Sequence, residues 1–96
     1  MKTTRTMEDA KSVQHDEWYA DDPLSLIAAD CPVLATVSSV VGRSLAYGEL
    51  KCSTTVTLQC AQSSDTVHQA GVMAFNKARE LTNAGMKLLA PDAGDI

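Results

Sequence analysis

The sequence predicts an α+β fold, a two-stranded antiparallel hairpin packed on one long C-terminal helix, with a short N-terminal helix before the hairpin. Three observations predict it. Residues 49–60 alternate apolar and polar side chains, which is typical of a strand with one buried face. Residues 33–41 form a second run rich in valine. From residue 63 to about residue 89, apolar side chains recur at helical spacing.

The length of 96 residues indicates one domain. Residues 1–21 are polar and show no clear apolar period, so we expect a flexible acidic arm there. Residues 22–91 are expected to form a single ββα domain. Residues 92–96 are expected to form a flexible tail.

A short helix is predicted to open the folded part. Asp22 is a suitable N-cap, and Pro23 fits the first helical position, where its missing N–H costs nothing. Cys31-Pro32 ends the helix after about two turns, because the residue before a proline disfavours helical geometry.

The two strands are predicted to pair through a turn at Tyr47-Gly48. In the second strand the even positions form the buried face, which includes Cys52 and Cys60. These two cysteines are eight residues apart on one strand, far beyond disulfide reach. With Cys31 they make an odd set of three without metal-ligand spacing, so we expect buried free thiols in a reducing, cytoplasmic protein.

The long helix is predicted to carry two apolar faces. Ser63, Ser64 or Asp65 can cap its start. One face follows a four-three spacing and consists of Val67, Gly71, Ala74, Ala78, Leu81, Gly85 and Leu88. The other consists of Val72, Phe75 and Met86. A two-stranded hairpin cannot cover both faces. Either the N-terminal segment, with Trp18 and Leu24, covers the second face in a monomer, or another subunit does, and we favour a homo-oligomer interface, with a dimer as the expected form.

The charge is unevenly distributed. Residues 1–30 carry seven acidic against three basic residues, and the remainder of the folded part is faintly basic. A chain with 12 acidic and 8 basic residues lacks the basic stripe of a general nucleic-acid binder, so a nucleic-acid partner is not expected. We expect no signal peptide, because the N-terminal residues include no apolar run, and no membrane span.

Residues 47–58, Tyr-Gly-Glu-Leu-Lys-Cys-Ser-Thr-Thr-Val-Thr-Leu, with the acidic-capped helix after them, resemble a recurrent class of small phage and mobile-element proteins. In that class a strand, a turn of the form aromatic-x-Glu, a second alternating strand and one long helix make a ββα unit. The resemblance spans about residues 37–89, and Gly48 interrupts the aromatic–Glu pair. It implies the ββα fold and a phage origin. It carries no catalytic residue, because most members of the class have no assigned activity.

No pattern for catalysis, metal or cofactor binding is present in the sequence. His15 and His68 have no partner at ligand spacing, and no glycine-rich phosphate loop occurs. A triad of a cysteine with His68 and Asp65 could be assembled, but both strand cysteines point to the buried face. We therefore expect a protein that is not an enzyme and has no cofactor.

The leading function hypothesis is a small phage-encoded binding protein that occupies a host protein surface, for instance to inhibit a host defence complex. The expected contact residues are Trp18, Tyr19, Asp21 and Asp22, because aromatic side chains dominate interface energetics. The alternative for Trp18 and Tyr19 is that they fold back and cover the core of the same chain. The alternative is an oligomer that holds a nucleotide-like anion between subunits. Its expected ligand residues are Arg43, Tyr47, Lys51 and Arg79.

Overall fold

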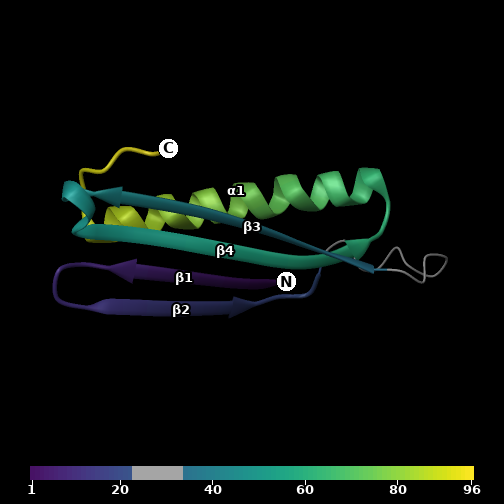
Figure 1. The fold of residues 1–96 in the computed structure, drawn as a ribbon, viewed down its shortest axis with the longest axis horizontal. Helices are drawn as coiled ribbons and strands as arrows, with labels where there is room; N and C mark the ends of the chain where they lie inside the picture. The colour runs from purple at the N-terminus through teal and green to yellow at the C-terminus, as the bar shows by residue number, and fades with distance from the viewer. Residues whose placement is uncertain (23–33) are drawn as a thin grey trace.

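The computed structural model describes residues 1–22 and 34–96. In this part of the chain, one sheet and one helix form two layers (Figure 1). The elements are β1 (Lys2–Glu8), β2 (Val13–Tyr19), β3 (Leu34–Leu45), a 3-10 turn (Ala46–Gly48), β4 (Leu50–Ala61) and α1 (Ser64–Leu89). The short helix expected after Asp22, together with Cys31, lies outside the described residues.

The sheet has four antiparallel strands in the order β2-β1-β4-β3, so the expected two-stranded hairpin is wrong. The two additional strands come from residues 1–21, where an arm was expected. Thr3, Arg5 and Met7 form the buried face of β1. Only one of these three side chains is apolar, so β1 has no apolar alternation, and its signal is limited to β-branched threonines.

The β1–β2 turn is built by an aspartate side chain. Asp9 Oδ1 accepts hydrogen bonds from the backbone N–H of Lys11 and of Ser12, both at 2.8 Å. Aspartate is favoured in turns because its carboxylate can bond to nearby backbone in this way. These bonds hold the pKa of Asp9 below its ordinary value. Asp9 is therefore the local signal for a hairpin in a polar stretch.

The β3–β4 hairpin confirms the predicted antiparallel pair and extends it. Leu34 pairs with Ala61 at one end and Leu45 with Leu50 at the other. Ala46, Tyr47 and Gly48 all have positive φ, so the turn centres where it was predicted. The even positions of β4 face the helix, and Cys52, Thr54, Val56, Leu58 and Cys60 are all buried, as the alternation predicted.

Helix α1 begins as predicted, with Ser63 Oγ accepting a hydrogen bond from the backbone N–H of Thr66 at 3.3 Å. It packs mainly on β4 and β3. Ala70, Ala74 and Ala78 are fully buried, so the helix backbone lies close to the sheet. Thr82 adds a polar contact in the core, because its hydroxyl donates to Val41 O at 3.0 Å and contacts Thr54 Oγ1 at 2.8 Å.

The predicted apolar face of α1 is correct in the middle and wrong at the ends. Val67 is exposed, and Leu88 keeps 70% of its surface in solvent. The fully buried positions near the C-terminal end include Thr82 and Met86 instead. The helix side chains that are buried are those that contact β4 and β3. Near the C-terminal end these side chains are not the ones that a fixed four-three spacing places on the apolar face.

Gly85 is a point of close approach between helix and sheet. A Cβ there would lie 2.6 Å from Cys52 Sγ and 3.1 Å from both Arg5 Cδ and Met7 Sδ. Gly71 has no such neighbour within 4 Å. None of the helices in the described part of the chain has the length and apolar character needed to cross a membrane.

Gly85→Ala is expected to lower the free energy of unfolding by about 1–3 kcal/mol, the usual cost of overpacking a core. Gly71→Ala is the matched control. It should raise that free energy by up to about 1 kcal/mol, because alanine has the better helix propensity and meets no clash there. Urea unfolding monitored by circular dichroism measures both. A Gly85→Ala variant as stable as Gly71→Ala would contradict the close contact.

Candidate functional site

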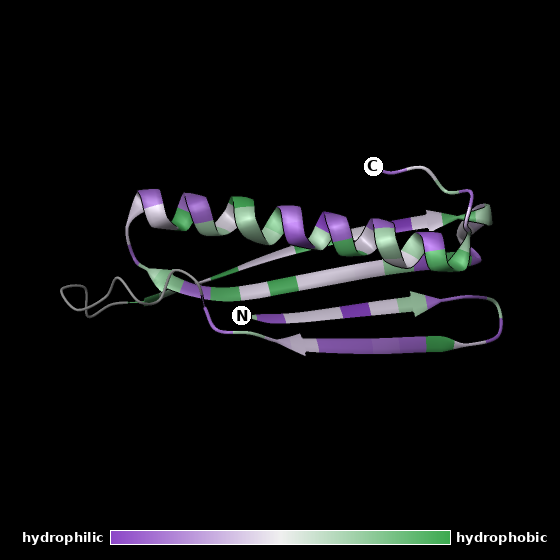
Figure 2. Cartoon of the chain, turned by 180° about the vertical axis from the view of Figure 1, so that it is seen from behind, coloured by the Kyte–Doolittle hydropathy of each residue, from purple (hydrophilic) through white to green (hydrophobic). Residues whose placement is uncertain are grey.

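The helix covers only part of the sheet, and β2 lies beyond its flank. Within the described residues α1 contacts β4 and β3 extensively and β1 only at its edge. Strand β2 is exposed along nearly its whole length. Figure 2 shows that β2 is mostly hydrophilic, whereas β4 carries apolar segments under the helix. The uncovered helix-side face of β2 therefore forms a ledge next to α1.

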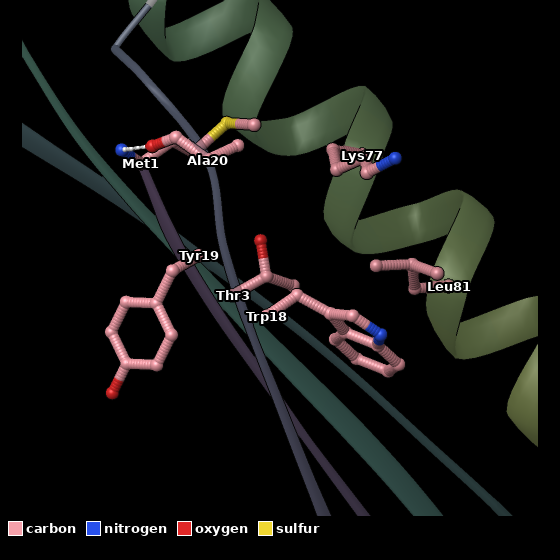
Figure 3. Close-up of a pocket in the computed structure, with 7 residues that line it drawn as sticks. All are labelled: Met1, Thr3, Trp18, Tyr19, Ala20, Lys77 and Leu81. Atoms are coloured by element: carbon pink, nitrogen blue, oxygen red, sulfur yellow. Dashed lines mark hydrogen bonds between the residues drawn. The ribbon is translucent and has the colours of Figure 1, made fainter.

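Trp18 lies on this ledge. It pairs with Thr3, which is buried, so both side chains project to the helix side of the sheet. Figure 3 shows the indole between β2 and α1, close to Leu81, while the Tyr19 ring points away from the helix. A cavity of about 200 Å³ opens here, lined by Met1, Thr3, Trp18, Tyr19, Ala20, Lys77 and Leu81. We call it the Trp18 groove.

Arg5 lies beside the groove and links three elements. Its guanidinium carbon is 5.1 Å from the Trp18 ring centroid, a cation–π distance. Its Nη1 donates to Leu81 O of the helix at 3.2 Å, and its Nη2 donates to Asp16 Oδ2 of β2 at 3.3 Å. A buried charge needs such partners to offset its desolvation. Arg5 therefore fixes Trp18 and the β2 ledge relative to the helix.

Asp22 forms an ion pair with the ammonium of Met1, a residue that lines the groove. Its Oδ1 lies 2.6 Å from the Met1 ammonium, and the same oxygen accepts from Gln59 N at 3.3 Å. The ammonium bond is the main cause of a pKa of Asp22 below the ordinary value. Of the four predicted contact residues, Trp18 and Tyr19 line the groove, Asp21 is exposed, and Asp22 is paired within the chain itself.

The four residues predicted to hold an anion are not brought together in one chain. Arg43 pairs with the buried Cys52 and so shares the helix-side face, where its Nη1 donates to Asn83 Oδ1 at 3.3 Å. Lys51 is exposed next to Cys52, and it lines an open pocket of about 420 Å³ together with Arg43. Tyr47 projects fully into solvent at the turn. The Arg79 guanidinium lies 5.7 Å from the centroid of the Phe75 ring. An anion site formed by these residues between two subunits therefore stays a prediction.

The three residues predicted for an oligomer interface also separate. Val72 and Phe75 remain 46% and 47% exposed on the helix flank that faces β3. Met86 is fully buried in the core of the same chain, together with Met7 and Cys52. The exposed pair therefore marks a surface, and Met86 marks the core.

The described residues contain no group of three or more His, Cys, Asp or Glu placed to hold a metal ion. Cys52 and Cys60 are buried free thiols, as predicted. Burial raises the pKa of the Cys52 thiol, which disfavours the reactive thiolate.

Sequence reasoning missed much of the groove. Met1, Thr3 and Arg5 lie in the stretch that showed no apolar period, and Lys77 carried no motif. Leu81 was placed on the buried face of the helix. The one usable signal was Trp18 itself, a large apolar side chain in an acidic polar stretch.

Comparisons with known proteins add no relative. No protein-family model matches the chain, and neither the curated proteins nor the solved structures include a significant match.

In a Cys31→Ser background, a thiol reagent at pH 8 should label Cys52 and Cys60 in the native protein at least tenfold more slowly than in urea. Both thiols are buried, and the raised pKa of Cys52 lowers its thiolate fraction further. Absorbance of the released chromophore measures the rates. If Cys52 and Cys60 of the native protein were labelled as fast as in urea, the even positions of β4 could not form its buried face.

Proposed function

We propose that this protein is a non-enzymatic binding protein whose Trp18 groove accepts an apolar side chain of a protein partner. The observation that carries the proposal is a half-exposed tryptophan beside a cavity of about 200 Å³, held by a buried arginine. Tryptophan is enriched among the residues that dominate binding energy at interfaces. A pre-positioned ring also limits the entropy lost on binding.

The charges around the groove favour a basic partner. Asp16 is paired with Arg5, and Asp22 with the Met1 ammonium. Glu17 is exposed on the face of β2 opposite Trp18, where it accepts a hydrogen bond from the Tyr19 hydroxyl at 3.1 Å, and Asp21 is exposed just after the strand. Complementary charge increases association rates and selects partners. The proposed occupant is therefore a protein segment with one apolar anchor residue beside lysine or arginine.

The resemblance to small phage proteins suggests the biological setting in which such a binding protein would act. A phage-encoded binder of this kind would act in the host cytoplasm by occupying a host protein surface, such as that of a defence complex. Self-association belongs to the same proposal. A dimer would present two Trp18 grooves and could gain avidity from a partner with two binding segments.

A random peptide library selected on the purified protein tests the groove. Enriched peptides are expected to combine an aromatic or aliphatic residue with lysine or arginine. Trp18 is the single tryptophan, so its fluorescence reports occupancy directly. Trp18→Ala should weaken binding of an enriched peptide about 30-fold or more, the effect of a hot-spot residue.

Tyr47→Asn is the matched control, because Tyr47 is an exposed aromatic residue remote from the groove and asparagine tolerates its positive φ. It should leave peptide binding unchanged. Fluorescence anisotropy of labelled peptides measures every variant, and circular dichroism confirms that each one is folded. Absence of any enriched peptide, or equal binding by Trp18→Ala, would refute the proposed groove.

A further inference from the structure

The two edges of the sheet differ in how they are protected against pairing. Strand β2 has seven residues and carries Asp16 on its helix side and Glu17 on its other side. Short edge strands and inward-pointing charges are the usual protection of a free edge. Strand β3 has 12 residues, no proline and one charged residue, Arg43, near its end. No strand among residues 1–22 and 34–96 pairs with the second side of β3.

The helix flank above the β3 edge is apolar and open. Val72 and Phe75 project there, and Val37 of β3 lies beneath them. A groove of about 490 Å³ runs between these elements, lined by Val37, Val67, His68, Gly71, Val72 and Phe75. An unprotected strand edge and an exposed apolar flank therefore occur on the same side of the molecule.

We infer that a second copy of this chain covers this side, with the two β3 strands pairing antiparallel across a two-fold axis near Ser39 and Val40. The result is one continuous eight-stranded sheet. This inference rests on the proposed self-association and is independent of the Trp18 groove, which lies at the other edge of the sheet.

The spacing of the layers supports this arrangement. In an antiparallel pair, opposite residues project to the same face, so both helices lie on one side of the joined sheet. Helix α1 packs on both β4 and β3, so we take its axis to lie between these two strands, about half a strand spacing from β3. With strands about 4.8 Å apart, the two helix axes come to lie about 10 Å apart. Packed helices are about 8–10 Å apart, so Val72 and Phe75 of each copy would fill the space between them.

Charge and area also fit a second copy. Pairing centred at Ser39 places Arg43 opposite Ala35 of the other copy, and pairing centred at Val40 places it opposite Val37. The two arginines are therefore far apart. A 12-residue strand spans roughly 40 Å, and the two layers together are about 20 Å deep. The edge thus offers roughly 800 Å² per copy, the size of a standard stable interface.

Sedimentation equilibrium at tens of micromolar protein tests the inference. The wild type is expected at dimer mass. Val40→Lys adds a charge close to the two-fold axis and should raise the dissociation constant at least tenfold. Val13→Lys is the matched control, the same change at an exposed valine of the other edge strand, and should remain dimeric. Phe75→Asp should weaken the dimer through the helix flank, and circular dichroism checks that every variant is folded.

The outcomes separate the linked proposals. A wild type of monomer mass would overturn both self-association and this surface. A dimer equally stable in Val40→Lys, Phe75→Asp and Val13→Lys would overturn this surface alone. A Trp18→Ala variant that stays dimeric but loses peptide binding would support both sites as separate.

Discussion

One helix has to cover a sheet of four strands, and this constraint determines the surfaces of the molecule. A helix of 26 residues is about 39 Å long, close to the roughly 40 Å of a 12-residue strand. Helix α1 therefore matches β3 and β4 in length. In width, a helix of about 10 Å covers two strands spaced about 4.8 Å apart. The other two strands lie under its flank or beyond it.

The polar character of β1 and β2 follows from this limited cover. At β1 the buried side chains are Thr3, Arg5 and Met7, and Arg5 uses its long side chain to reach both the helix and β2. At β2 the cover is absent, so nearly every residue is exposed and only Trp18 brings a large apolar surface toward the helix. The groove proposed as the binding site is thus a consequence of the narrow helix layer.

The same constraint makes the β3 side different. There the helix packs on β3, so this edge carries an exposed apolar cluster that comprises Val37, Val72 and Phe75. A short, charged edge strand such as β2 is protected against pairing with a strand of another molecule, whereas a long and nearly uncharged edge strand is prone to it. In the proposed dimer, a second copy would cover both exposed features at once.

The limited width of the helix layer also explains which strands could be predicted from the sequence. Strand β4 lies between two strands and under the helix, so burial imposed a strict alternation from Cys52 to Cys60 that could be read directly. The capped helix was equally readable. Strand β1 could not be found, because its buried positions use Thr3 and Arg5, whose burial depends on contacts from distant segments. Met86 was misplaced for a related reason, since its partners Met7 and Cys52 come from two strands, one of which was not expected.

The residues of the proposed binding site were only partly predictable. Trp18 and Tyr19 stood out as aromatic residues in a polar stretch. Nothing local showed that Arg5 would lie beside Trp18 or that Leu81 and Lys77 would form the opposite wall. Such a site exists only once β2 is placed beside the helix, which requires the pairing of β1 with β4 across some 50 residues of sequence.

Hydrogen exchange of individual backbone amides tests most directly the central claim that the two sheet edges differ. In an edge strand every second amide points away from its partner strand. At tens of micromolar protein, we expect the outward amides in the centre of β3 to exchange as slowly as those bonded to β4, while the outward amides of β2 exchange rapidly. Equally rapid exchange of the outward amides in β2 and β3 would contradict the account.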